Sequence, residues 1–420
     1  MAVSFGHHTR IGFFLASRQI RRASWWTTGL IVFVMVLTFL NLVVVSGILV
    51  GLIEGSVTAQ RKLYTSDVIL STLKEKTYIE HSPEVITTIQ TLPQVDVFSA
   101  RYLQSGKIEA NYKDRIKDTD KPNETGAQFV GIDPEAEDAL TQISSRVVEG
   151  QYLLPTDYDQ ILLGSQLLKT YLPVDNPGFS ALENVSVGTK VRVIINGISR
   201  EMTVKGIVKS KVGEIEQRAY MVDSQFRGLV GRGDYNVSEL AIRLKPNADP
   251  VAVRDALIRN GVDKVAKVQT YVDAQPKFLL DIKQTFAVLG NMISSIGLVV
   301  ASITVFIVIF INAITRRKFI GILKGIGISG AAIEISYMIQ SLFYAVAGSL
   351  IGLIVLYGFL QPFISAHPID FPFSDGILVA PFTETMFRVG LLIFTTIVAG
   401  YIPARMIVRK NTLDSILGRK

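Results

Sequence analysis

The second of four long apolar stretches decides the fold: Phe286–Ile314, "FAVLGNMISSIGLVVASITVFIVIFINAI". Its 29 residues include no charged side chain. As an α-helix it would be about 43 Å long, whereas the hydrocarbon core of a bilayer is about 30 Å thick. Apolar residues continue upstream at helical spacing through Phe278, Leu279 and Ile282. We therefore predict a spanning helix that continues out of the membrane to an external domain, and steep tilt is the alternative.

Three more apolar stretches have the length of a membrane span: Trp25–Val50, Ile335–Leu360 and Thr385–Ile402, the last with Arg388 near its start. The hydrophobic share of 49% and the mean hydropathy of +0.36 also favour a membrane protein. The first stretch is too long for a cleaved signal peptide and no A-x-A site follows it. The sequence predicts four spans, at residues 25–51, 283–314, 334–361 and 385–403.

The basic residues orient these spans. Thirteen of them lie before Trp25, between Arg316 and Lys324, and after Pro403, with Asp414 as the single acidic residue there. The segment 52–282 instead has 28 basic and 31 acidic residues. The positive-inside rule places both termini (1–24 and 404–420) and residues 315–333 in the cytoplasm, and segments 52–282 and 362–384 outside. The net charge of +7 thus belongs to membrane-flanking segments, which argues against nucleic-acid binding.

The external segment repeats one strand–helix–strand pattern. "SDVILSTL", "SPEVITTIQTL" and "QVDVFSARYL" form the first unit, and "VSELAIRL", "ADPVAVRDALIRNG" and "DKVAKVQTYV" the second. Two such units can share one sheet as a split ferredoxin-like fold. Residues of about 104–236 would be an inserted, mostly β subdomain with a hairpin turn at Asn196-Gly197. The predicted fold class is an α-helical four-span transmembrane domain plus an α+β extracytoplasmic domain, preceded by a short interfacial helix over Ile11–Ile20.

Catalytic signatures are absent from the sequence. Gly325-Ile-Gly327-Ile-Ser-Gly330 matches G-x-G-x-x-G, but it follows a membrane-length helix and not a strand, so a dinucleotide site is disfavoured. The chain has no Walker A sequence, no G-x-S-x-G, no H-E-x-x-H and no cysteine. We expect no catalytic residue, cofactor or metal site in this chain. The acidic cluster Asp133, Glu135, Glu137 and Asp138 is expected to form a solvated helix start.

Small residues mark one face of the third span. Gly348 and Gly352 form a G-x-x-x-G pattern, which permits close helix packing within one subunit or across a dimer.

Residues 315–333 form the most informative cytoplasmic segment. In "RRKFIGILKGIGIS" (316–329), isoleucine and leucine alternate with basic residues and glycine. The segment is too short and polar to span a membrane, but it suits a short amphipathic helix that docks a cytoplasmic partner. A simple stop-transfer cluster of charges is the alternative.

This segment resembles the motif R-R-x-E-I-G-I-L-[RK]-A-[LIM]-G-[AM]-S of the FtsX-like, MacB/LolC-type permeases of ABC transporters. The matching residues are Arg316, Arg317, Ile320, Gly321, Ile322, Leu323, Lys324, Gly327 and Ser329. "PARMIVRKNTLDSIL" (403–417), "VVEGQYL" and "ILLGSQLL" are also similar to family stretches. The chain departs from the motif at Phe319, where the family usually has Glu, and at Gly330-Ala331-Ala332, which replace a basic pair.

The resemblance implies a permease subunit of an export or lipoprotein-release complex in the bacterial cytoplasmic membrane. A separate cytoplasmic ABC ATPase would bind ATP and dock on the matching residues together with Lys318. A second permease copy, identical or not, would complete a dimer among membrane lipids, and ATP-driven closure would reshape the external domain. A periplasmic adaptor or a lipoprotein is a further partner that the family allows. The alternative is a non-transporting scaffold that regulates a cell-wall hydrolase or senses a peptide, and the sequence does not identify a cargo.

Overall fold

The computed structural model describes residues 2–113, 122–172, 180–367, 369–371, 374–376 and 378–409. The chain divides into two compact units, which we describe separately. The helical unit holds residues 1–53, 280–370 and 376–420, and the α/β unit holds residues 54–279 and 371–375. Residues 173–179, and residues 410–417 of the family-like C-terminal stretch, lie outside the described residues.

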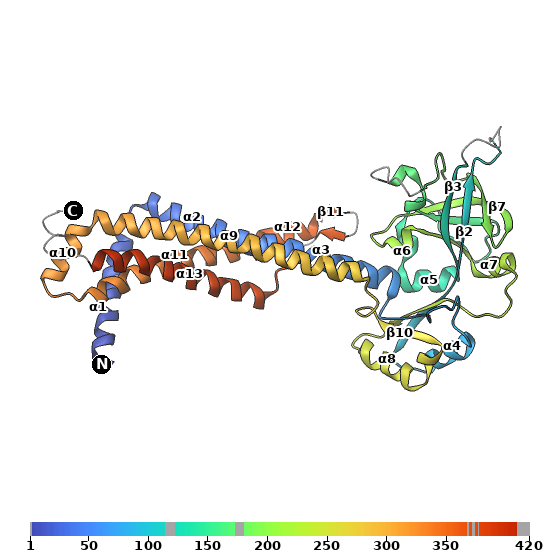
Figure 1. The fold of residues 1–420 in the computed structure, drawn as a ribbon, viewed down its shortest axis with the longest axis horizontal. Helices are drawn as coiled ribbons and strands as arrows, with labels where there is room; N and C mark the ends of the chain where they lie inside the picture. Colours follow the sequence, from blue (N-terminus) through green and yellow to red (C-terminus); the bar gives the residue numbers. More distant parts are fainter. Residues whose placement is uncertain are drawn as a thin grey trace. The chain divides into compact units, whose positions relative to one another are not determined.

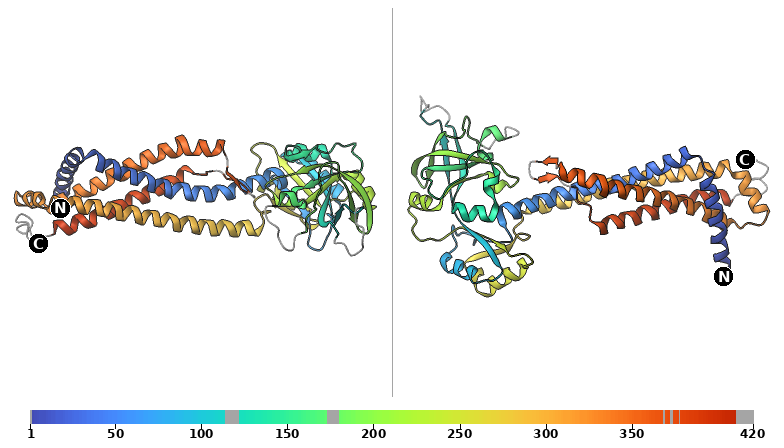
Figure 2. Two further views of the ribbon diagram at one scale, coloured as in Figure 1. Left: turned by 90° about the horizontal axis from the view of Figure 1, so that it is seen from above. Right: turned by 180° about the vertical axis from the view of Figure 1, so that it is seen from behind.

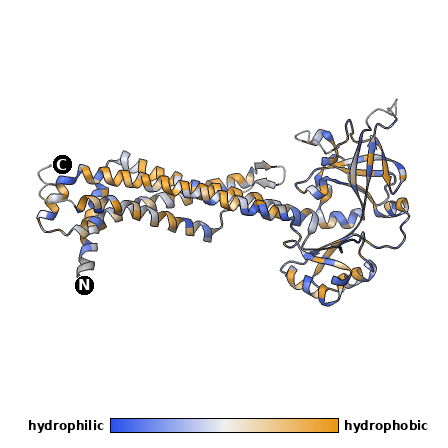
Figure 3. Cartoon of the chain, in the orientation of Figure 1, coloured by the Kyte–Doolittle hydropathy of each residue, from blue (hydrophilic) through white to orange (hydrophobic). Residues whose placement is uncertain are grey.

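The helical unit contains long apolar helices that run side by side (Figures 1 and 2). They are α2 (Trp25–Leu40), which continues through the π-helix η1 (Asn41–Val45) into α3 (Ser46–Gln60), α9 (Lys277–Thr315), α11 (Gly330–Val355) and α13 (Phe382–Val408). Four helical runs in the described residues are long and apolar enough to cross a membrane. Apolar side chains are concentrated along them (Figure 3), as expected of an integral membrane protein.

Helix α11 lies at the centre of the bundle, and glycine lets its neighbours approach. A Cβ atom at Gly348 would lie 2.3 Å from the Cβ of Met35 on α2, and one at Gly352 would lie 2.2 Å from the Phe39 ring. A Cβ atom at Gly400 of α13 would lie 1.8 Å from the Ser341 hydroxyl. The G-x-x-x-G pattern therefore packs α11 against α2 of the same subunit. Helix α1 (Ala2–Arg21) packs against the start of α11, where Gly12 contacts Ile335.

Helix α9 is the least covered of these helices. In its last 15 residues the buried side chains occur at every fourth residue and so form one narrow face: Ala301, Val305, Ile309 and Ala313. Large apolar side chains cover the remainder and are exposed, among them Val288, Met292, Ile296, Val299, Ile303, Ile307, Ile311 and Ile314. A helix with this pattern needs lipid or another protein around it.

Arg388 is a charged side chain within the fourth predicted span, and its polar partners lie on α2–α3. Its guanidinium donates to the Leu42 carbonyl oxygen at 2.8 Å and to the Ser46 hydroxyl at 2.6 Å. Leu42 lies in the π-helix η1, where the wider turn loosens the i→i−4 ladder and frees carbonyl oxygens. The Ser294 hydroxyl of α9 donates to the same oxygen at 3.4 Å. The π-helix η1 thus supplies a hydrogen-bond acceptor for the Arg388 cation, which apolar surroundings would otherwise destabilise.

The α/β unit contains the predicted ferredoxin-like subdomain. Its strands are β1 (Val68–Thr72), β2 (Val95–Ala110), β9 (Glu239–Leu244) and β10 (Ala266–Thr270), paired antiparallel in the order β10-β1-β9-β2. Helices α4 (Ser82–Gln90) and α8 (Pro250–Arg259) share one core with this sheet, so both cover the same face. This is the strand order of a split βαβ fold, and it confirms the predicted class.

The inserted subdomain is a closed six-stranded barrel, a feature that the sequence did not predict. The long strand β2 continues into it and pairs with β3 (Glu124–Ile132), which is followed by β8 (Arg218–Val222), β5 (Gln160–Gly164), β7 (Ile198–Val208) and β6 (Lys190–Ile195). Strand β6 pairs with both β7 and β2, which closes the ring. Asn196 and Gly197 both have positive φ in the β6–β7 turn, as predicted. Closure leaves the barrel without an open edge.

Three short helices and one short strand complete the described part of the barrel subdomain. They are α5 (Pro134–Thr141), β4 (Val147–Gly150), α6 (Gly213–Glu216) and α7 (Asp223–Val230). Figure 1 shows this subdomain and the ferredoxin-like subdomain with α4 and α8 as two lobes of one unit.

Candidate functional site

Residues 316–329 form a short helix between two membrane-length helices. α10 (Arg317–Gly325) follows α9 after a single residue, Arg316, and ends two residues before Gly327, whose φ of +94° only glycine adopts readily. Ser329 then caps α11, because its hydroxyl accepts a hydrogen bond from the Ala332 amide at 3.3 Å. Gly330 begins α11. The G-x-G-x-x-G match therefore follows a helix and not a strand, so it lacks the context of a dinucleotide site.

One face of α10 is fixed to the bundle. Ile320, Gly321 and Leu323 are buried, and Ile320 and Leu323 belong to the main core of the helical unit. The Lys324 ammonium donates to the Val408 carbonyl oxygen at the end of α13, at 2.9 Å. This contact caps the C-terminus of α13 with a cation, which its dipole favours. The Ser329 hydroxyl lies 2.8 Å from Nδ1 of His8, so α1 also contacts the segment, which was not predicted from the sequence.

The opposite face of α10 is apolar and exposed. Phe319 is 56% exposed, Ile322 is 51% exposed and Ile326, one residue after the helix, is 72% exposed. Their spacing of three and four residues puts them on one stripe. Lys318 is exposed beside it, and Arg316 and Arg317 are half-buried. We call Phe319, Ile322 and Ile326 the α10 stripe. Of its members, Phe319 is the departure from the family motif, where Glu is usual, and Ile322 and Ile326 stand at positions where the motif has apolar residues.

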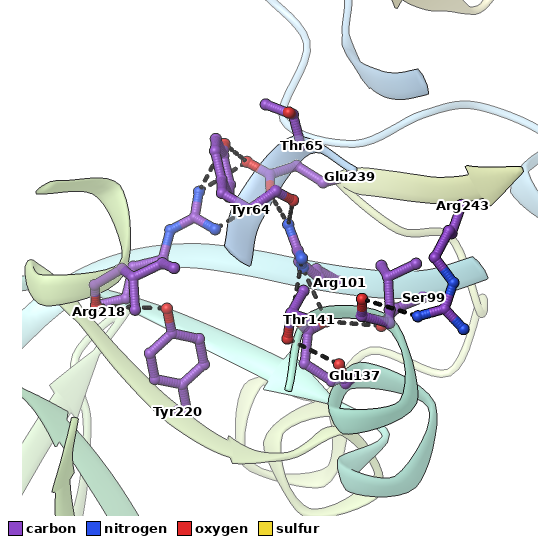
Figure 4. A network of polar contacts seen from close by, with 12 residues as sticks. Tyr64, Thr65, Ser99, Arg101, Glu137, Thr141, Arg218, Tyr220, Glu239 and Arg243 are labelled. Atoms are coloured by element: carbon purple, nitrogen blue, oxygen red, sulfur yellow. Dashed lines mark hydrogen bonds and ion pairs between the residues drawn. The ribbon is translucent and has the colours of Figure 1, made fainter. Parts of the chain in front are cut away.

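A second group of polar residues is buried in the α/β unit (Figure 4). Arg101 of β2 is 1% exposed and Glu137 of α5 is 2% exposed. Their two-pronged ion pair has nitrogen–oxygen distances of 2.9 and 2.7 Å. The hydroxyls of Ser99 and Thr141 donate to the same carboxylate at 2.7 and 3.4 Å. The expectation that Glu137 belongs to a solvated cluster is therefore wrong: Asp133 caps α5, and the first turn of the helix points Glu137 inward.

The network extends to a second ion pair. Arg218 of β8 donates to both oxygens of Glu239 of β9 at 3.1 and 2.7 Å, and Arg101 approaches the same carboxylate at 3.5 Å. Burial raises the pKa of Glu239, but the Arg218 guanidinium outweighs this effect and lowers it to about 2. Burial likewise opposes the charge on Arg101, but Glu137 outweighs it and raises the Arg101 pKa. Two cations and two anions thus neutralise one another away from water.

Tyr64 joins the network to the end of the first long helical run. It lies in the π-helix η2 (Arg61–Thr65), which follows α3. Its hydroxyl donates to Glu239 at 2.9 Å and accepts from Arg218 at 3.2 Å, while its carbonyl oxygen accepts from Arg101 at 3.0 Å. The π-turn frees the Tyr64 carbonyl oxygen to accept from Arg101. Hydrogen bonds therefore hold both the backbone carbonyl and the side-chain hydroxyl of Tyr64. The network therefore ties η2 to strands of both subdomains. We call Tyr64, Arg101, Glu137, Arg218 and Glu239 the Tyr64 network.

The described residues contain no group of three or more His, Cys, Asp or Glu side chains that could hold a metal ion. The Arg-Gly-Asp stretch at 232–234 is an internal ion pair, in which Arg232 binds Asp234. The two groups that stand out are therefore the α10 stripe, which is open to a partner, and the Tyr64 network, which is closed.

Comparison with known proteins identifies the family. The MacB-like periplasmic core domain matches residues 28–260, more than half of the chain, and the FtsX-like permease C-terminal domain matches residues 291–412. The chain belongs to the MacB/FtsX-type family of ABC transporter permeases. FtsX-like permeases are in general non-catalytic components that work with ABC ATPases.

Two curated relatives match part of the chain. The macrolide export ATP-binding/permease protein MacB of Pasteurella multocida is 26% identical over 49% of the chain and 31% of its own length. The uncharacterized ABC transporter permease MJ1507 of Methanocaldococcus jannaschii is 23% identical over 54% of the chain and 58% of its own length. The matches thus span about a third and somewhat more than half of these relatives.

Two solved structures are also similar. The periplasmic region of MacB from Actinobacillus actinomycetemcomitans has a TM-score of 0.36 and 14% identity, and it covers 54% of this chain and 94% of that one. The extracellular domain of the noncanonic ABC-type transporter YknZ from Gram-positive bacteria has a TM-score of 0.32 and 13% identity, with 49% and 99% coverage.

Proposed function

We propose that this chain is the permease subunit of an ABC-type export or lipoprotein-release complex in the bacterial cytoplasmic membrane, with both termini in the cytoplasm. In this proposal a separate ATPase docks on α10. The observation that carries it is the α10 stripe: three large apolar side chains are exposed on a helix whose other face is fixed in the bundle. Exposed apolar side chains gathered on one face of a fixed helix favour burial against a protein partner.

The stripe also suggests the chemistry of the partner. Phe319 stands where the family resemblance leads us to expect Glu, so the ATPase should present an apolar pocket at this position in place of a cation. Lys318 is exposed next to Phe319, and an acidic rim on the pocket would complement it. An apolar groove with an acidic rim is therefore the surface that we expect on the ATPase.

Transmission would use the two helical runs that join the units along the chain. α10 follows α9 after one residue, and α9 is a 39-residue helix that begins at Lys277 in the α/β unit. The run α2–α3 ends at η2, which the Tyr64 network holds. We propose that ATP-driven closure of the ATPase displaces α10 and reshapes the α/β unit through these runs. A second permease copy would complete the complex, and the exposed face of α9 is available for it or for lipid.

The decisive experiment replaces Phe319 by Glu in the full chain, co-expressed with its ATPase. We expect the variant to retain less than about a tenth of the ATPase on purification, because a buried charge without a cationic partner costs several kcal/mol. The permease-dependent part of the ATP hydrolysis should fall with it. The matched control is Tyr235→Glu, which alters an exposed aromatic side chain of the α/β unit and should behave as wild type.

Two outcomes would change the proposal. If Phe319→Glu and the double variant Ile322→Asp/Ile326→Asp both keep a full complement of coupled ATPase, α10 is not the docking element. If the ATPase docks but the complex carries no cargo and instead binds a cell-wall hydrolase, the non-transporting scaffold replaces the exporter. Unchanged hydrogen exchange in α11 shows that the variants are folded.

A further inference from the structure

A polar pocket lies within the α/β unit, apart from the Tyr64 network. Its volume is about 400 Å³, within the range that holds a small organic ligand. Ser56 and Gln60 of α3 form one wall, and Lys211 together with α6 and its flanking residues forms another. Val212, Pro276 and Leu279 provide apolar surface.

A close approach of two backbone segments builds the polar wall. A Cβ atom at Gly164, at the end of β5, would lie 2.2 Å from the Glu216 carbonyl oxygen. Glycine at this position therefore allows α6 to lie against the end of β5. The approach brings Gln166 to Glu216, where the amide nitrogen donates to the carboxylate at 2.8 Å.

Most hydrogen-bonding groups of this wall are already engaged. Both oxygens of Glu216 accept, one from Gln166 and one from the Ser210 amide at 2.7 Å. The Gln166 carbonyl oxygen accepts from Gln217 at 3.0 Å. The Lys211 ammonium donates to the Phe371 carbonyl oxygen at 2.7 Å. The side-chain amides of Gln166 and Gln217 and the Lys211 ammonium thus all donate to groups of the protein.

One buried acceptor is not. Gln60 is 6% exposed, and its amide nitrogen donates to Glu214 at 3.3 Å, but its carbonyl oxygen is buried and lacks a hydrogen-bond partner among the described residues. The half-buried Glu214 carboxylate lies next to it and accepts the Gln60 bond through one of its two oxygens. A buried acceptor without a partner is costly and needs a donor from outside the chain.

We propose that this pocket binds an organic ammonium ion with an apolar body. The ammonium would donate to the Gln60 carbonyl and the Glu214 carboxylate, and the body would lie on Val212, Pro276 and Leu279. Two glutamates against one lysine make the lining net acidic, which favours a cation. A peptide fits less well, because its carbonyl oxygens would place further acceptors beside the oxygens of Gln60 and Glu214. The proposal is independent of the docking of an ATPase on α10.

Benzylamine is a suitable probe, because benzyl alcohol and benzoate have the same ring with a neutral and an anionic head. Each would be titrated against the full chain in lipid nanodiscs, with saturation-transfer NMR on the ring protons and empty nanodiscs as the blank. We expect saturable binding of benzylamine and at least about tenfold weaker binding of the other two probes, because only the ammonium makes charge-assisted hydrogen bonds.

Two variants and one control locate the site. Glu214→Gln keeps the shape and removes the charge, and Gln60→Leu removes the acceptor. Each should weaken benzylamine binding about tenfold or more. Glu135→Gln, at an exposed carboxylate of α5, should leave it unchanged. Equal hydrogen exchange of α6 and β5 in all three variants shows that the pocket is intact.

The proposal is overturned if benzylamine gives no saturable signal above the blank. It is also overturned if benzyl alcohol or benzoate binds as tightly, or if both pocket variants bind like Glu135→Gln. None of these results bears on the proposed docking of an ATPase, which is measured by co-purification and on a different unit.

Discussion

The α10 stripe and the Tyr64 network handle charge and apolar surface in opposite ways. Around α10 the apolar side chains face outward and the basic ones lie beside them, so the segment is incomplete without a partner. In the Tyr64 network, two arginines and two glutamates are buried and satisfy one another. The exposed arrangement suits a surface to which a partner protein binds reversibly. The buried arrangement suits a rigid connection between η2 and the strands. The comparison separates an exposed apolar surface from a closed, buried polar network.

The largest effect should come from breaking the network. Arg101→Met leaves the Glu137 carboxylate buried without its cation, so we expect the α/β unit to lose about 3–5 kcal/mol of stability. The double variant Arg101→Met/Glu137→Met should recover most of that loss, since it removes both charges. Amide hydrogen exchange in β2 and β9 of the full chain measures the change.

Lys76→Met is the control for this prediction, because it breaks an exposed ion pair with Glu80 on the surface of the same unit. It should leave exchange in β2 and β9 at the wild-type rate. An Arg101→Met variant that exchanges no faster than Lys76→Met would show that the network does not stabilise the unit. A double variant as unstable as the single one would assign the effect to packing and not to the unpaired charge.

The positions of these two groups show what the sequence could predict. Residues 316–329 are contiguous, so their charges, glycines and isoleucines are visible together in 14 residues. The Tyr64 network is assembled from positions 21 to 175 residues apart. No local pattern links Arg101 to Glu137 before the strands are in register. From its sequence neighbours alone, Glu137 belongs to an acidic cluster, but in the structure it is buried and paired with Arg101 of β2.

The fold likewise contains features that local sequence patterns predict and features that depend on residues far apart in the chain. Four membrane-length helices and two strand–helix–strand units follow from periodicity and length, which are local properties. Closure of the barrel depends on β6 pairing with β2, about 80 residues earlier in the chain, and short alternating strands do not specify such a partner. The π-turns at 41–45 and 61–65 were likewise not predictable. The arginines that bind the carbonyl oxygens of Leu42 and Tyr64 are distant in the sequence, so no local pattern marks these turns.

Low pH should destabilise the Tyr64 network by less than the Arg101→Met substitution does, and it should leave α10 unaffected. The pKa of Glu239 in the folded unit is about 2, below the ordinary value of about 4.3 for Glu. The stabilisation is therefore complete above about pH 4.3 and is lost as the pH falls toward 2. In the wild type, the protection of the β8 and β9 amides against exchange, relative to their intrinsic exchange rate at each pH, should fall over this range. Glu239→Gln should show a much flatter dependence.

Glu135→Gln serves as the control, because it changes the same chemical group at an exposed position of the unit. Its acid profile should match the wild type. A Glu239→Gln profile as steep as that of the wild type would mean that other carboxylates govern acid stability, and the network would then be no more than one pair among several.

The smallest effect should come from a polar contact between α10 and the end of α13. Lys324→Met removes the hydrogen bond to the Val408 carbonyl but keeps the apolar stem, so we expect a loss of about 0.5–1.5 kcal/mol. Ile320 and Leu323 still anchor the helix, so α10 should loosen without detaching, and its hydrogen exchange should rise a few-fold while that of β2 stays constant. Lys318→Met, at an exposed position one turn from Ile322, should leave exchange in α10 unchanged. If Lys324→Met and Lys318→Met exchange alike, apolar contacts alone hold α10, and a docked ATPase would push against a helix that the end of α13 does not brace.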